Sequence, residues 1–220
     1  MQIFQYLVAH HRKWRHPRVC GAAAQGGHLK LLQFLRLNDC PWDSATTVEA
    51  ARGGHLDLIK WALAEGCECY SDACSQAARK GHLEVLQLLR AKGCGWDAYT
   101  AVWAADEGHL DVLKWAIENG CEYDSNVCAQ AAANGHLEVL QWLREKGCEW
   151  DAVTCRQAAA SGHLTVLQWA RENGNKREIR QIEERDSVSE IRWRGGVVRE
   201  GDEEEKMKKS SLALREKRRK

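Results

Sequence analysis

Residues 131–148 read AAANGHLEVLQWLREKGC, and variants of this stretch recur along most of the chain. The Gly-His-Leu at its centre occurs six times, each copy 27 residues after the one before, with no insertion or deletion. The copies are Gly27-His28-Leu29, Gly54-His55-Leu56, Gly81-His82-Leu83, Gly108-His109-Leu110, Gly135-His136-Leu137 and Gly162-His163-Leu164. Self-similarity at a fixed period of this length is the signature of a repeat protein.

Each repeat combines a pair of small residues before the Gly-His turn with an apolar segment after it. The alanine pairs are Ala23-Ala24, Ala50-Ala51, Ala77-Ala78, Ala104-Ala105, Ala131-Ala132 and Ala158-Ala159. After the turn, residues such as Leu137, Leu140 and Trp142 cover two sides of a helix with 3.6 residues per turn. A helix that is apolar over so much of its surface must lie between neighbouring repeats, so the copies are expected to stack.

The ends of these helices also carry local signals. A Gly-Cys pair closes the second helix, because glycine suits the left-handed residue past a helix end. An aromatic residue and then Asp follow, and Asp is a preferred N-cap for the next helix. These pairs are Trp42-Asp43, Trp96-Asp97, Tyr123-Asp124 and Trp150-Asp151. The expected unit is therefore a short first helix, a Gly-His turn, a longer second helix and a short loop.

This pattern resembles the ankyrin repeat, which has two alanines, a Gly-His-Leu turn and a second helix rich in Val and Leu. The resemblance covers about residues 18–174 and implies an all-α solenoid of stacked helix–turn–helix repeats that binds other proteins. The unit is about six residues shorter than the usual ankyrin repeat of about 33 residues. The missing residues fall where ankyrins carry a β-hairpin finger, and the Thr-Pro-Leu-His opening is absent. We therefore expect a purely helical stack with tight loops.

The repeats divide the chain into three parts. Residues 1–17 are expected to be the second helix of a partial repeat, residues 18–174 six repeats, and residues 175–220 a charged tail that is disordered or partly helical. Ile179 and Ile182 are candidates for a helix over the open end of the stack. The basic run at residues 215–220 is either a solvated end or a nuclear-localisation or nucleic-acid patch. This organisation suggests a fragment of a longer array.

Composition bears on location and on partners. No run approaches the about 18 apolar residues that a membrane span needs, and residues 1–9 lack a basic leader. We therefore expect a cytoplasmic protein, with the nucleus possible and no membrane partner. Residues 1–174 carry a slight acidic excess, whereas nucleic-acid binding needs a strongly basic face. Nucleic acid is thus an unlikely partner.

The ten cysteines suggest a metal-binding or redox-responsive module as one alternative. Nine of them fall in two repeat columns, where free cysteine acts as a small hydrophobe. The columns are Cys40, Cys67, Cys94, Cys121 and Cys148, and Cys20, Cys74, Cys128 and Cys155. Neighbours in one column should lie about 8–10 Å apart, beyond the about 7 Å that a disulfide allows, and the columns are not expected to converge. Cys67, Cys69 and Cys74 form one local cluster, but we predict no metal and no cofactor.

The histidines and most tryptophans follow the repeat as well. Six of the nine histidines occupy the Gly-His turn, which indicates a role in the turn rather than in catalysis. Catalysis needs a unique constellation in a pocket, so we expect no enzyme and no small-molecule substrate. Two columns of tryptophans are expected to be core: Trp61, Trp115, Trp142 and Trp169 in the second helix, and Trp42, Trp96 and Trp150 in the loop.

Trp103 belongs to neither column. It replaces Ala22, Glu49, Gln76, Gln130 and Gln157 of the other repeats, at a position expected to face outward from the first helix. Tyr99 lies one turn earlier and Asp106 one turn later, and Arg52 and Arg79 hold the position of Asp106 in the two preceding repeats. Exposed aromatic residues rimmed by arginine are typical of interaction hot spots. The alternative is that Trp103 only fills a shallow gap.

The sequence thus predicts a scaffold that binds a partner protein through the first-helix face, which is concave in ankyrin-like stacks. The predicted partner-binding residues are Tyr99, Trp103, Asp106, Arg79, Arg52, Gln76 and Gln130. The main alternative is a structural spacer, or a piece of a longer array, with no partner of its own.

Overall fold

The computed structural model describes residues 15–148 and 152–173, and within these ranges all regular secondary structure is α-helical. The helices are α2 (Pro17–Gln25), α3 (Leu29–Leu37), α4 (Ser44–Arg52), α5 (Leu56–Ala64), α6 (Ser71–Arg79), α7 (Leu83–Ala91), α8 (Ala98–Asp106), α9 (Leu110–Glu118), α10 (Ser125–Ala133), α11 (Leu137–Glu145), α12 (Ala152–Ala160) and α13 (Leu164–Asn173). Each repeat contributes two of them, from α2 and α3 in repeat one to α12 and α13 in repeat six. The predicted all-α solenoid is confirmed, and the described residues contain no β-hairpin finger.

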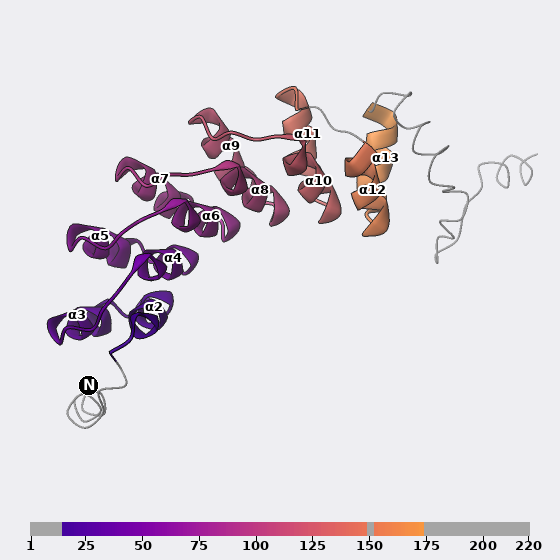
Figure 1. Cartoon of the computed structure of the whole chain (residues 1–220). Helices are drawn as coiled ribbons and strands as arrows, with labels where there is room; N and C mark the ends of the chain where they lie inside the picture. Colours follow the sequence, from indigo (N-terminus) through magenta and orange to yellow (C-terminus); the bar gives the residue numbers. More distant parts are fainter. Residues whose placement is uncertain (1–14, 149–151, 174–220) are drawn as a thin grey trace, which may run out of the picture. The chain divides into compact units, whose positions relative to one another are not determined.

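The helices form two layers (Figure 1). The first helices of the repeats, α2, α4, α6, α8, α10 and α12, lie side by side and pack directly on one another. Alanines make this close approach possible, since Ala50, Ala77 and Ala104 are fully buried between neighbouring first helices. We call the exposed side of these helices the first-helix face.

The apolar core lies between the two layers and between successive repeats. Its largest side chains come from the second helices and include Leu32, Leu35, Leu86, Leu113 and Leu140, all almost completely buried. Full burial of such a side chain contributes about 1.5–3 kcal/mol. These side chains belong to one apolar cluster that extends through the described repeats, so stacking of the repeats is a main source of the stability.

In repeats one to five the two helices have the same length, contrary to the expectation of a longer second helix. The first and second helices of repeat two, α4 and α5, both span nine residues. The second helix is shorter than expected because His55 stands at its N-cap and Glu65 is already its C-cap. Gly66 then leaves the helix with φ of 81°, which confirms the predicted left-handed closing glycine.

The predicted Asp N-caps are confirmed in two repeats. The side chains of Asp43 and Asp124 accept hydrogen bonds from the backbone N–H groups of Ala45 (3.1 Å) and Asn126 (2.9 Å). Asp97 holds the same position but accepts from the Ser75 hydroxyl at 3.4 Å instead. Asp151 lies outside the described residues.

The Gly-His turn joins each repeat to the one before it. His136 is the N-cap residue of α11, but its ring makes no cap hydrogen bond. Its Nε2–H instead donates to the backbone carbonyl of Asp106 in the preceding repeat, at 2.9 Å. The ring rests against Gly108, where a Cβ atom would lie 2.5 Å from Nδ1 of His136. The predicted turn role of the histidines is thus also an inter-repeat contact.

The tryptophan columns lie at the edge of the core rather than inside it. Only Trp142 is buried, at 9% exposure, among the described members of the two columns. Trp61 and Trp115 are half-buried, because each meets the ring of a loop tryptophan near the surface. The ring centroids are 5.6 Å apart for Trp42 and Trp61 and 5.7 Å apart for Trp96 and Trp115.

The contacts around each pair of contacting tryptophans recur after two repeats. Arg36 of repeat one lies over Trp42, with the guanidinium carbon 4.3 Å from the ring centroid, and its Nη1 donates to the Cys40 carbonyl at 2.8 Å. Arg90 makes the same contacts two repeats later, with Trp96 at 4.1 Å and the Cys94 carbonyl at 2.7 Å. A pair of repeats is therefore a structural period in its own right.

Several expectations concern residues outside the described ranges. These are the partial repeat at residues 1–14, the helix containing Ile179 and Ile182, and the basic run at residues 215–220. Among the helices that are described, none has the length and apolar character needed to cross a membrane.

Candidate functional site

Tyr99 and Trp103 lie one turn apart on α8, at the centre of the first-helix face. Tyr99 is 63% exposed, and Trp103 is half-buried. The residues between them that point inward, Thr100 and Ala101, are fully buried against the neighbouring helices. The outward position expected for Trp103 is thus only partly correct, since a side chain of the preceding repeat covers one face of its ring.

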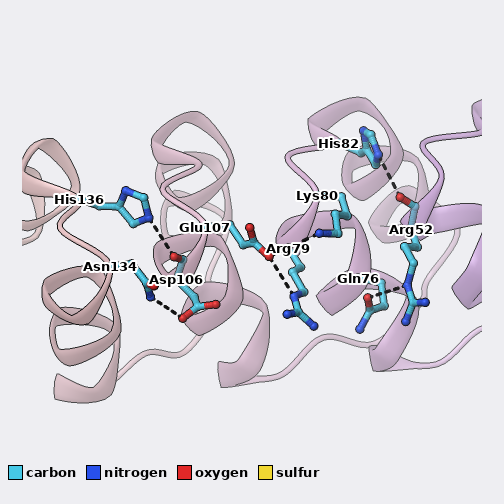
Figure 2. Close-up of polar contacts among 9 residues, drawn as sticks. All are labelled: Arg52, Gln76, Arg79, Lys80, His82, Asp106, Glu107, Asn134 and His136. Atoms are coloured by element: carbon cyan, nitrogen blue, oxygen red, sulfur yellow. Dashed lines mark hydrogen bonds and ion pairs between the residues drawn. The ribbon is translucent and has the colours of Figure 1, made fainter. Parts of the chain in front are cut away.

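That side chain is Arg79, from the last turn of α6. Its guanidinium carbon lies 4.4 Å from the centroid of the Trp103 ring. Its Nε donates to Oε1 of Glu107 at 3.2 Å, and Lys80 reaches the same oxygen at 3.4 Å (Figure 2). The structure therefore brings together Tyr99, Trp103 and Arg79 as the sequence predicted, and adds Lys80 and Glu107.

Arg52 takes a different place from Arg79. Its Nε donates to Oε1 of Gln76 at 3.2 Å, and its Nη1 pairs with Glu49 at 3.4 Å. Gln76 is half-buried in the middle of α6, on the repeat that follows Arg52. Both predicted residues thus belong to the first-helix face, with Arg52 two repeats and Gln76 one repeat before the aromatic pair.

Asp106 and Gln130 lie on the other side of the aromatic pair. The Asp106 carboxylate accepts a hydrogen bond from the Asn134 side chain at 2.8 Å, across the junction between repeats four and five (Figure 2). The Asn134 amide also donates to the backbone carbonyl of Gln130 at 3.2 Å. Gln130 itself is half-buried on α10.

Lys80, Glu107 and Asn134 were not among the predicted site residues. They occupy one repeat column, directly before the glycine of each Gly-His turn, where repeats one and two have glycine. Each of them contacts a neighbouring repeat, so together with Arg52 and Arg79 they form a polar ladder along this end of the first helices (Figure 2). The signal in the sequence was the change from Gly to Lys, Glu and Asn in this column.

The ladder contains an ionised carboxylate at neutral pH. The Arg79 hydrogen bond and, to a smaller extent, the Lys80 charge lower the pKa of the Glu107 carboxyl below its ordinary value. Glu107 is part of the exposed surface, so this ion pair contributes little to stability. Its effect is to hold the Arg79 side chain in place over Trp103.

The two cysteine columns converge, contrary to expectation. The Sγ atoms of Cys20 and Cys40 lie 3.5 Å apart, and those of Cys128 and Cys148 lie 3.1 Å apart. The prediction was based on the distance between cysteines of one column in successive repeats. The observed contacts instead join one cysteine of each column within the same repeat. Burial raises the pKa of the Cys20 thiol to about 12, so this thiol is protonated at neutral pH and packs as an apolar side chain.

Cys69, the cysteine outside both columns, forms a disulfide with Cys94. Their Cα atoms are 5.5 Å apart, and the bond links the loop before α6 to the loop after α7. The sequence did not predict this bond, because Cys69 lies outside both cysteine columns and only distances along one column were compared. It takes Cys69 out of the cluster with Cys67 and Cys74, and the described residues contain no group of three or more ligands that could hold a metal ion.

Comparisons with known proteins agree with this architecture. A family model for ankyrin repeats (3 copies) matches residues 47–127 and again residues 74–154. Among solved structures, the crystal structure of the human ASB11 ankyrin repeat domain is similar, with a TM-score of 0.59. The alignment covers 71% of this chain and 83% of that chain at 17% sequence identity, so the likeness concerns the fold. No curated protein matches the sequence.

Proposed function

Because the repeats of this chain belong to the ankyrin-repeat family, we propose that the protein binds another protein through its first-helix face. Ankyrin repeats are generally protein-interaction modules, and stacked repeats offer extended surfaces for this purpose. The proposed site is centred on repeats three to five and comprises Tyr99 and Trp103 with the polar residues around them. We propose a binding role rather than catalysis, in the cytoplasm or the nucleus.

The observation that carries the proposal is the exposure of Tyr99 beside Trp103. The corresponding positions of the other repeats carry small, polar or charged side chains, apart from Val153 in repeat six. Tyr99 is a large aromatic side chain that is 63% exposed and makes no contribution to the buried core. Tyrosine and tryptophan dominate interaction hot spots, because they offer a large rigid contact area together with a polar group.

The test compares partner capture by wild type and three variants, using proximity labelling followed by a binding assay with the captured protein. Tyr99→Ala and Trp103→Ala should each weaken binding by about 2 kcal/mol or more, as truncation of a hot spot does. Tyr70→Ala is the matched control, since Tyr70 is also an exposed tyrosine at the start of a first helix, at 53% exposure. Tyr99→Ala should leave the melting temperature unchanged.

The outcome separates binding from a purely structural role. A spacer without a partner would yield the same captured proteins for wild type and for all three variants. If Trp103→Ala lowered stability as much as Trp115→Ala does, while Tyr99→Ala left binding intact, Trp103 would belong to the core and the proposed site would be wrong.

A redox-responsive module is the second candidate, and the Cys69–Cys94 disulfide favours it. In this alternative, formation and reduction of the bond would alter partner binding. Equal binding by Cys69→Ser and wild type would argue against it.

A further inference from the structure

Arginine side chains lie over tryptophan rings in three places within the described residues. They are Arg36 over Trp42, Arg90 over Trp96 and Arg79 over Trp103. The distances from the guanidinium carbon to the ring centroid are similar, between 4.1 and 4.4 Å. The three arginines differ in what the rest of the guanidinium contacts, and this difference separates architecture from recognition.

Arg36 and Arg90 have an architectural role. Their Nη1 atoms donate to the carbonyls of Cys40 and Cys94, at 2.8 and 2.7 Å, just past the end of their own helices. Both carbonyls lie in the loops that follow the helices, where no helical hydrogen bond satisfies them, and backbone carbonyls that are not exposed need a partner. The terminal nitrogens of these two arginines therefore help to close their own repeats.

Arg79 makes its hydrogen bond through Nε instead. Nε donates to Glu107, the ring of Trp103 supports one face of the guanidinium, and no hydrogen bond or ion pair of the two Nη atoms is found in the described residues. Figure 2 shows both Nη atoms pointing away from Glu107. The Arg79 side chain is 36% exposed, so this edge is open to a partner.

We propose that the Nη edge of Arg79 receives the carboxylate of an Asp or Glu side chain on the partner protein, while Tyr99 and Trp103 contact an apolar residue beside it. This inference rests on the proposed function. A guanidinium presents a planar fork that matches a carboxylate through two parallel hydrogen bonds. Because the ring and Glu107 already hold Arg79 in place, little side-chain entropy is lost when the partner binds.

The charges around Arg79 favour a carboxylate over a phosphate group. Glu107 is ionised and bonded to Arg79, and Asp106 is its neighbour in sequence at the end of α8. A phosphate group with nearly two negative charges would be repelled by both carboxylates more strongly than a singly charged side chain. Arg52 and Lys80 add positive charge on the side of the preceding repeats.

The experiment selects ligands for the full-length protein from a random-peptide display library and, in parallel, from a phosphopeptide library. The selected peptides should share an acidic residue next to an apolar one. Arg79→Lys keeps the charge but removes the fork, and should weaken binding at least about tenfold, which corresponds to about 1.4 kcal/mol. Replacing the acidic residue of the peptide by its amide should weaken binding to the wild type as much as Arg79→Lys does. The same replacement should not further weaken binding to the Arg79→Lys variant.

Lys80→Gln is the matched control, because it removes a positive charge beside the same Glu107 oxygen. It should weaken binding much less than Arg79→Lys does. The inference is overturned if Arg79→Lys binds like wild type, if Lys80→Gln has the larger effect, or if phosphopeptides bind more tightly than acidic peptides. If Tyr99→Ala loses binding while Arg79→Lys retains it, the inference fails and the proposed function stands. If Tyr99→Ala also binds every selected peptide like wild type, both fail.

Discussion

Two glycines of repeat four have the same left-handed backbone but different surroundings. Gly108 (φ 78°) lies in the Gly-His turn, and a Cβ atom there would be 2.5 Å from Nδ1 of His136. Gly120 (φ 87°) closes the second helix, and a Cβ atom there would have no neighbour within 4 Å. The turn glycine is therefore needed for two reasons, backbone conformation and space, whereas the closing glycine is needed for conformation alone.

We predict that Gly120→Ala lowers the free energy of unfolding by about 1–2 kcal/mol, the cost of a left-handed residue with a Cβ. Gly108→Ala should cost more, because the His136 ring must move and its hydrogen bond to Asp106, with a net value of about 1 kcal/mol, is lost. Urea unfolding of the two variants measures the difference. Equal losses would show that the histidine contact adds nothing to the junction.

Side-chain contacts were harder to predict from the sequence than backbone signals were. The Gly-His turn and the closing glycines were read correctly, because each depends on residues close together in one repeat. The proximity of Arg79 to Trp103 was also expected, but the hydrogen bond from Arg79 to Glu107 was not, because it joins different columns of successive repeats. A comparison of equivalent positions shows which residues are unusual at a position but not which neighbour they meet.

At the scale of elements, the Cys69–Cys94 disulfide joins two successive loops, and its cysteines are separated by 25 positions in the sequence. We predict that protein purified without reductant titrates eight thiols in denaturant, and ten after reduction. Cys69→Ser should lower the free energy of unfolding by about 2–4 kcal/mol under oxidising conditions, because the cross-link restricts the unfolded chain. Under reducing conditions the two proteins should differ much less.

The number of free thiols in protein alkylated at the moment of cell lysis tests the proposed location. Disulfides persist in oxidising compartments, whereas the cytosol keeps thiols reduced. Ten reactive thiols at lysis would agree with a cytoplasmic protein in which the bond forms only on oxidation. Ten thiols in fully air-oxidised protein would contradict the bond itself.

At the scale of the whole array, the fold followed from the sequence, because one strongly periodic pattern determined helices, turns and stacking together. The two-repeat period was not predicted from the sequence, because a search for a 27-residue period treats all repeats as equivalent. Arg36, Trp42 and Trp61 nevertheless recur two repeats later as Arg90, Trp96 and Trp115. Their contacts show why the longer period exists: a loop tryptophan needs an arginine before it and a tryptophan after it.

This period predicts that deleting two repeats is better tolerated than deleting one. Removal of residues 43–69 places Leu88 where Trp61 packed on Trp42, and it leaves Cys94 without Cys69. Removal of residues 43–96 instead brings Trp42 against Trp115, with Arg36 in the position of Arg90. Edge-to-face aromatic pairs contribute about 0.5–1.5 kcal/mol beyond their buried area. Removal of two repeats restores such a pair at Trp42, whereas removal of one repeat does not.

We therefore expect the chain with two repeats deleted to unfold cooperatively, at a urea midpoint at least as high as that of the longer chain with one repeat deleted. In a simple stack each repeat adds its own interfaces, so stability would follow length. A clearly higher midpoint for the chain lacking residues 43–69 would mean that length outweighs the aromatic junctions, and that the pair of repeats is not an energetic unit.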